Sequence, residues 1–294
     1  MKITDCQIHE IGPFWDWLPE SEELQHKILS EMMVAYLDAV GVERAVLFTG
    51  DTFESAAWMA EKLPKRIAFV PQINAEAPDI DAAMRAAKAH HSAGQLGVRI
   101  LISWPMDGSE ARRLEAGGWD PVFAACERYR LPVFILITGL LPRAADIARR
   151  YPDLTLVIDH IGLRQPPADE PDDPPFAKLP ELLALARFPN VHVKLCGLPS
   201  LSKEPFPYSD VAPHLRAIVD AFGAERLMWA SDTSRFAGRT GIYRFQFPKT
   251  LGDYTGKHTY AESLLFIRES NVLTPVEKEA ILGGTLQRVL NWPN

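Results

Sequence analysis

The chain has 294 residues, of which 47% are hydrophobic and 23% charged, as is usual for a globular protein. Its formal net charge of -7 argues against a nucleic-acid-binding protein, because such proteins present a basic surface. Three scattered cysteines exclude a disulfide framework and a C-x-x-C zinc site, and they fit a reduced, cytoplasmic setting. The N-terminus lacks the apolar core of a signal peptide, and the longest uncharged apolar run, 131–141, is far shorter than the ~20 residues that span a membrane.

Apolar strands alternate with helices along the chain. The sequence predicts strands at 2–11, 44–49, 66–74, 97–102, 131–138, 154–162, 191–197 and 226–232. It predicts helices at 21–40, 53–63, 79–93, 121–129, 142–151, 181–186, 210–222, 261–269 and 275–290.

Eight such units predict a single-domain (β/α)8 TIM barrel over residues 1–294, since that fold typically takes about 250 residues. A doubly wound open sheet is the competing architecture. No glycine-rich phosphate turn follows the first predicted strand, so the barrel is preferred.

Three of the predicted strands end in polar residues that suit catalysis. Asp232 ends the eighth strand and His160 the sixth, while the period of two places Asp5, Gln7 and His9 on one face of the first. Parallel strands of a barrel present their C-terminal ends at one mouth, where active sites lie. A buried carboxylate needs partners, so we expect Asp232, His9 and His160 to meet there.

Two imidazoles and a carboxylate at one mouth can act in two ways. They can hold a divalent metal, zinc being the best match, which activates a water molecule. Alternatively, Asp232 can act as general base on water while His9 and His160 polarise a carbonyl group. The residues alone leave both mechanisms open.

Four motifs give the chain a family resemblance. D-x-x-x-H in the first strand, V-I-D-H-I-G in the sixth, V-H-V-K-L-C-G in the seventh and R-L-M-W-A-S-D in the eighth resemble the amidohydrolase superfamily. Within it, the chain is most similar to the amidohydrolase-2 group, and there to the lactonase-like branch that acts on 2-pyrone-4,6-dicarboxylate and sugar lactones. The resemblance covers nearly the whole chain, including a closing L-G-G-T-L-Q-R-V-L segment.

The chain departs from the superfamily at two expected metal ligands. Gln7 stands where the first strand usually has a second histidine, and the fifth strand offers only Thr138. The ligand set implied by the resemblance shrinks to His9, His160 and Asp232. Because some members of the dicarboxylate-lactone branch work without metal, we expect the metal to be optional.

The resemblance implies a hydrolase that opens a lactone or related cyclic ester of a carboxylate-bearing small molecule. Two alternatives remain open, a metal-dependent decarboxylase of an aromatic acid and a barrel that binds a ligand without catalysis. A panel of lactones and hydroxybenzoates distinguishes the three. The terminal helices and rim loops are compatible with a homodimer.

Several further residues are candidates for binding an anionic substrate. Arg99 lies inside an apolar strand, where it either clamps a substrate carboxylate or forms a structural ion pair. Lys194 has the same ambiguity on the seventh strand, and Arg235 lies in the loop after Asp232. Trp15 can line an aromatic pocket or anchor a loop. Gln7 completes the predicted substrate-binding set.

Cys196 and the segment 164–175 are predicted to have structural rather than catalytic roles. Cys196 has no histidine placed by sequence to activate it, so it is interpreted as a small buried residue. The proline-rich acidic segment 164–175 is interpreted as a surface loop.

Overall fold

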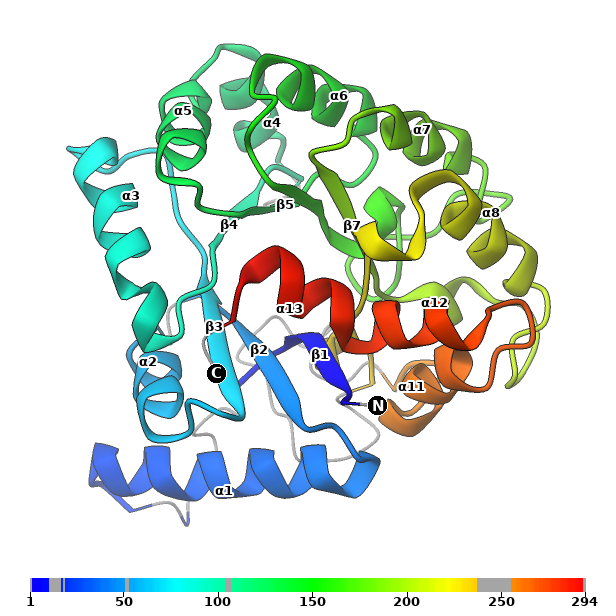
Figure 1. The fold of residues 1–294 in the computed structure, drawn as a ribbon, viewed down its shortest axis with the longest axis horizontal. Coiled ribbons are helices and arrows are strands. Elements are labelled where there is room, and N and C mark those ends of the chain that lie inside the picture. Colours follow the sequence, from blue (N-terminus) through cyan, green and yellow to red (C-terminus); the bar gives the residue numbers. More distant parts are fainter. Residues whose placement is uncertain are drawn as a thin grey trace.

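The computed structural model describes residues 2–10, 17, 19–50, 53–103, 107–236 and 255–292. Eight strands occupy the centre of the molecule, and helices surround them (Figure 1). The strands are β1 (Thr4–Ile8), β2 (Arg44–Thr49), β3 (Ile67–Pro71), β4 (Val98–Leu101), β5 (Val133–Leu136), β6 (Leu156–Ile158), β7 (Val191–Leu195) and β8 (Leu227–Trp229).

The helices largely follow the predicted ranges. They are α1 (Glu22–Val40), α2 (Phe53–Lys62), α3 (Ile80–Ala89), α4 (Ser109–Glu115), α5 (Asp120–Tyr129), α6 (Leu141–Arg150), α7 (Leu179–Leu183), α8 (Ala212–Phe222), α11 (Tyr260–Arg268), α12 (Pro275–Glu279) and α13 (Thr285–Leu290). Helix α4 was not predicted, and a π-helical turn at Ala280–Gly284 separates α12 from α13 where one helix was expected. Among the described residues, no helix is both long and apolar enough to cross a membrane.

The strands pair in parallel in chain order and close into a barrel. One ladder joins β1 to β3 and a second joins β4 to β8. Single parallel bridges, Phe69 with Gln95 and Gln72 with Arg99, connect the two ladders. On the other side, the amide of Asp232 donates to the carbonyl oxygen of Gln7 at 2.9 Å. The predicted (β/α)8 architecture is therefore confirmed.

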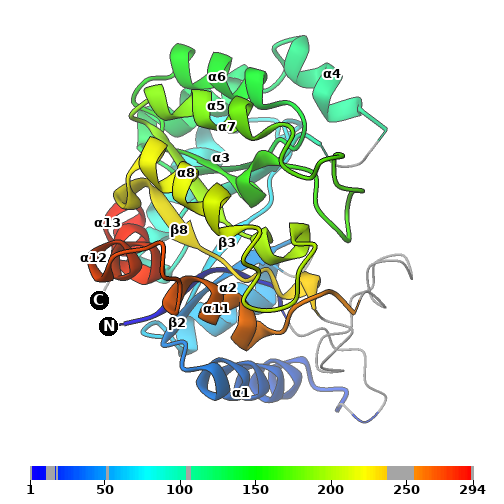
Figure 2. The ribbon, with the colours of Figure 1, turned by 90° about the vertical axis from the view of Figure 1, so that its right-hand side faces the viewer.

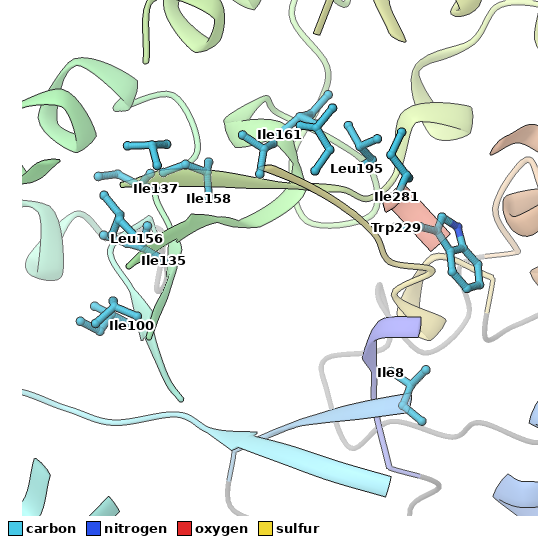
Figure 3. Packing of buried hydrophobic residues seen from close by; sticks show 14 of the residues in the cluster. Ile8, Ile100, Ile135, Ile137, Leu156, Ile158, Ile161, Leu195, Trp229 and Ile281 are labelled. Carbon is cyan, nitrogen blue, oxygen red and sulfur yellow. The ribbon is translucent and has the colours of Figure 1, made fainter. Parts of the chain in front are cut away.

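Alternating residues of each strand face two different apolar layers. Ile100, Ile135, Leu156 and Ile158 belong to the outer layer, where the strands pack against the surrounding helices (Figure 3). The inner layer fills the barrel itself and consists of Cys6, Val46, Phe48, Ala68, Val70, Leu96, Phe134, Val157, Cys196, Met228 and Ala230, with Leu286, Leu290 and Trp292.

The C-terminal segment closes the end of the barrel at which the N-terminus lies (Figure 2). Leu286 and Leu290 of α13 pack into the inner layer there. The opposite end, formed by the C-terminal ends of the strands, is the mouth of the barrel.

A bulge in β1 overturns part of the predicted strand phase. Asp5 pairs with Ala45 and Ile8 with Leu47, so β1 advances three residues while β2 advances two. The Asp5 carboxylate accepts hydrogen bonds from the amides of Gln7 and Ser231, at 3.0 and 2.9 Å. The Gln7 side chain instead reaches Lys194 inside the barrel. The prediction that Asp5 shares the face of Gln7 and His9 is therefore wrong.

Strands β6 and β8 end earlier than predicted, and tight turns follow them. His160 and Asp232 lie beyond the strands with φ of 54° and 51°, in the left-handed region. His160 would follow the outward-facing Ile158 if β6 continued, so the turn redirects its side chain toward the mouth. Such backbone conformations are uncommon for residues other than glycine, and they concentrate at functional sites.

Candidate active site

Asp232 lies at the centre of a polar cluster at the mouth of the barrel and is 3% exposed. Its Oδ1 is 3.1 Å from His9 Nε2, and its Oδ2 is 3.8 Å from His160 Nε2. Arg235 Nε lies 3.1 Å from Oδ2, and the Ser234 hydroxyl donates to Oδ1 at 2.6 Å. The structure thus brings together the three residues that the sequence analysis selected for catalysis.

The surroundings fix the charge of Asp232 and of His160. Burial raises the pKa of Asp232, but chiefly the His9 hydrogen bond and the Arg235 charge outweigh this effect and hold that pKa well below its usual range. For His160, burial and the Arg235 charge hold the pKa well below 6.5. At neutral pH the site therefore contains a carboxylate and a neutral imidazole with one donor and one acceptor nitrogen.

His9 is held on three sides yet remains partly accessible. Its Nδ1 is 3.0 Å from the carbonyl oxygen of Phe48, and its backbone amide donates to Thr233 Oγ1 at 3.0 Å. Gln7 Nε2 lies 3.2 Å from its Nε2. The His9 side chain is 21% exposed, the most of any side chain in ion-pair contact with Asp232 in the described part of the chain.

Asp159 is a central residue that the sequence analysis did not select. Its Oδ2 lies 2.8 Å from Arg99 Nε and its Oδ1 2.7 Å from Lys194 Nζ. Burial raises the pKa of this carboxyl, but the two cations overcome that effect and lower it to about 2. A sequence signal existed, because two cations inside apolar strands require a buried anion, and Asp159 directly precedes His160.

Arg99 and Lys194 both face the barrel interior, at different depths. The Arg99 side chain is 11% exposed, and its Nη2 approaches His160 Nε2 at 3.5 Å. The Lys194 side chain is fully buried, 3.7 Å above the centre of the Phe48 ring, and donates to Gln7 Oε1. Arg99 forms the structural ion pair, one of the two roles left open for it. Substrate binding by Arg99 or Lys194 stays a prediction.

The start of the proline-rich segment belongs to the site, which corrects its interpretation as a surface loop. Gln165 is 2% exposed, and its Nε2 donates to the carbonyl oxygens of His160 and Cys196 at 3.1 and 3.2 Å. The Pro166 carbonyl oxygen accepts a hydrogen bond from Arg235, which is 3% exposed. The remaining predicted binding residue, Trp15, lies outside the described residues.

The same cluster offers donors for a metal ion. Ligand atoms of His160, Cys196 and Asp232 lie within 4.8 Å of one another. Nitrogen, sulfur and oxygen donors at such spacing fit a single zinc ion. Burial raises the pKa of the Cys196 thiol, so metal binding there would have to displace its proton. Cys196 is fully buried, as expected, but its place beside His160 and Asp232 was not foreseen.

Comparison with known sequences gives two lactone-hydrolysing relatives. The chain is 44% identical to an L-fucono-1,5-lactonase of Burkholderia ambifaria over 130 residues, which span 42% of each protein. It is 36% identical to a 4-sulfomuconolactone hydrolase of Hydrogenophaga intermedia over 237 residues, which span 78% of this chain and 73% of that enzyme.

Solved structures share the fold over the full length. An amidohydrolase of Burkholderia multivorans with bound zinc superimposes with a TM-score of 0.71 at 21% identity, covering all of both chains. A probable 2-pyrone-4,6-dicarboxylic acid hydrolase of Acinetobacter baumannii, with citric acid bound, gives 0.67 at 15% identity over 99% of this chain and 100% of that one.

The family model described as Amidohydrolase matches residues 4–292. The strand-end motifs, the TIM barrel and this match agree, and the chain belongs to the amidohydrolase family.

Proposed function

We propose that this protein hydrolyses a lactone of a small molecule that bears a carboxylate or another anionic group. Both sequence relatives are lactone hydrolases by name, which supports the class of reaction. The single observation behind the mechanism is the buried Asp232 carboxylate, in contact with His9 and Arg235 and close to His160. A low pKa in the free protein keeps this carboxylate ionised, which is the state that a general base requires before the reaction.

Water is the nucleophile in the proposed mechanism. As the water oxygen attacks the ring carbonyl carbon, Asp232 takes one of its protons. The carbonyl oxygen becomes an oxyanion, which the Arg235 guanidinium and the neutral His160 stabilise by hydrogen bonding. The tetrahedral intermediate then expels the ring oxygen, which recovers the proton from Asp232. The product is the open hydroxy acid.

The charge balance of the site supports an anionic substrate. Arg99, Lys194 and Arg235 contribute three positive charges, and in the part of the chain that the structure describes their ion pairs are with Asp159 and Asp232. A mostly buried cluster that contains three cationic side chains favours binding of an anion. Since the whole chain has a net charge of -7, this positive charge is local to the mouth. We assign the substrate anion to Arg99, whose side chain is 11% exposed, against 4% for Arg235 and 0% for Lys194.

A divalent metal is an optional part of this proposal. His160, Asp232 and Cys196 would hold it, with His9 beside Asp232, and zinc suits these donors. When bound, the metal would polarise the lactone carbonyl as a Lewis acid.

The test of the proposed reaction uses matched pairs of lactones, with and without a carboxylate, together with hydroxybenzoates. Ring opening is measured as proton release with a pH indicator in weak buffer. Decarboxylation is measured as release of carbon dioxide. We expect ring opening, with the carboxylated lactone preferred by about tenfold or more in kcat/KM. Carbon dioxide release alone would establish the decarboxylase, and binding without turnover would establish the non-catalytic barrel.

Asp232→Asn tests the general base directly. General acid–base groups typically contribute about 100-fold to 10,000-fold, so kcat should fall by about 100-fold or more while the far-ultraviolet circular dichroism spectrum is unchanged. Asp146→Asn removes an exposed carboxylate paired with Arg149 and serves as the matched control, with activity unchanged. Activity of Asp232→Asn near that of the control would exclude Asp232 as the base.

A further inference from the structure

Arg235 occupies the part of the site that a metal ion would need. Its Nε lies 3.1 Å from Asp232 Oδ2, and its guanidinium also lies against the Cys196 thiol. Asp232 and Cys196 are two of the three residues whose ligand atoms cluster within 4.8 Å. Arg235 therefore contacts donor atoms through which a metal would be bound.

The fold provides a defined seat for this guanidinium. Gly197 has a φ of 72°, and a Cβ atom built on it would lie 2.9 Å from Arg235 Nε and 2.0 Å from Gln165 Oε1. Any side chain at Gly197 would therefore displace the two groups that pack there. The Pro166 carbonyl oxygen accepts from the far side of the guanidinium, and Arg235 is 3% exposed. Arg235 is thus held in place from several directions.

Two cations cannot share this seat. A guanidinium nitrogen 3.1 Å from Asp232 Oδ2 excludes a metal ion from the same volume beside that oxygen. Repulsion between a divalent ion and an adjacent guanidinium is also strong where water is excluded. Metal binding would therefore require Arg235 to leave a buried position that the fold supports.

We propose that Arg235 and a divalent metal ion are alternative occupants of one place beside Asp232 and Cys196, and that Arg235 is the resident cation. The competition is a property of the free protein. Only its consequence for catalysis, that a side chain supplies the positive charge that a metal supplies elsewhere, rests on the proposed lactone hydrolysis.

Zinc affinity measured without substrate tests the competition. Metal-free wild type, Arg235→Met and Arg99→Met are titrated with zinc in the presence of a chromophoric chelator. We expect Arg235→Met to bind one zinc ion about tenfold or more tightly than the wild type. Arg99→Met removes a neighbouring guanidinium that pairs with Asp159 and approaches His160 at 3.5 Å, so it should change the affinity much less than loss of Arg235, which contacts both Asp232 and Cys196. Adding Cys196→Ser to Arg235→Met should abolish most of the gain, which locates the ion.

The two arginine variants separate competition for one place from a general relief of positive charge. Equal zinc affinities of wild type and Arg235→Met would overturn the proposal. An equal gain in zinc affinity in Arg235→Met and Arg99→Met would also overturn it, because that result would show that removing either positive charge favours the metal. If Arg235→Met does not fold, Arg235→Gln provides the test, because the amide keeps a hydrogen-bonding side chain but removes the positive charge, and an unchanged affinity would again contradict the proposal. Loss of lactone hydrolysis as a function would leave all of these binding results intact.

Discussion

The buried carboxylate of Asp159 makes a strong prediction for stability. Asp159→Asn keeps the shape of the side chain but leaves Arg99 and Lys194, 2.8 and 2.7 Å away, without their shared anion. Removing one member of a buried ion pair typically costs about 3–5 kcal/mol. The lowering of the Asp159 pKa from 3.8 to about 2 by itself corresponds to about 2 kcal/mol of stability at neutral pH. Both this value and the typical cost of breaking a buried ion pair exceed the effect of an ordinary surface substitution.

Urea unfolding followed by tryptophan fluorescence measures this cost. With an m value of about 3 kcal/mol per molar, the unfolding midpoint of Asp159→Asn should fall by about 1 M or more. The double variant Asp159→Asn, Lys194→Met removes one orphaned cation and should recover part of the loss. Asp146→Asn, on the surface, is the matched control. A loss below about 1 kcal/mol in Asp159→Asn, or no recovery in the double variant, would refute the assignment of Asp159 as the shared counterion.

Two further predictions concern stability outside the candidate site. Burial lowers the pKa of His192 to about 4. As the pH is lowered from 6.5 to 4, the unfolded chain therefore binds a proton that the native chain does not, and the free energy of unfolding decreases by up to about 3 kcal/mol. His192→Gln should flatten the decline of the urea midpoint over this range, whereas an equally steep decline would show that other groups cause it. Thr274 and Glu277 cap α12 reciprocally, so Thr274→Ala should cost about 1 kcal/mol by thermal unfolding and Thr274→Ser much less; equal costs would exclude the cap.

Much of the fold was predictable because apolar periodicity is a local signal. The strand ranges 44–49 and 191–197 enclose β2 and β7 closely, and the helix over 21–40 begins after Ser21, whose side chain accepts from the Leu24 amide. Helix α4 escaped prediction since its core contribution is small, with Leu114 its only buried residue. The short polar turn therefore offered little periodicity to detect.

The site was predictable only as a convergence of strand ends. His9, His160 and Asp232 do meet, but His160 would point away from the mouth if β6 continued, because it follows the outward-facing Ile158. A left-handed turn, rather than the strand period, brings it to the mouth. Single-residue turns of this kind depend on tertiary support, which no local pattern records. The bulge that moves Asp5 off the face of Gln7 was hidden for the same reason.

Gln7 shows how a departure from a family pattern can have a positive role. The sequence analysis took it as a lost metal ligand. In the structure, Lys194 is fully buried and directs its ammonium hydrogens to Asp159, the face of Phe48 and Gln7 Oε1. An ammonium has no acceptor, so the carbonyl side of the Gln7 amide must face it, and the nitrogen then faces His9. A histidine bound to a metal at this position would not offer that carbonyl acceptor, and Lys194 would keep only the Asp159 carboxylate as its hydrogen-bond acceptor among these neighbours. Gln7 and Arg235 thus both support the proposal that side-chain cations, rather than a metal ion, supply the positive charge of the site.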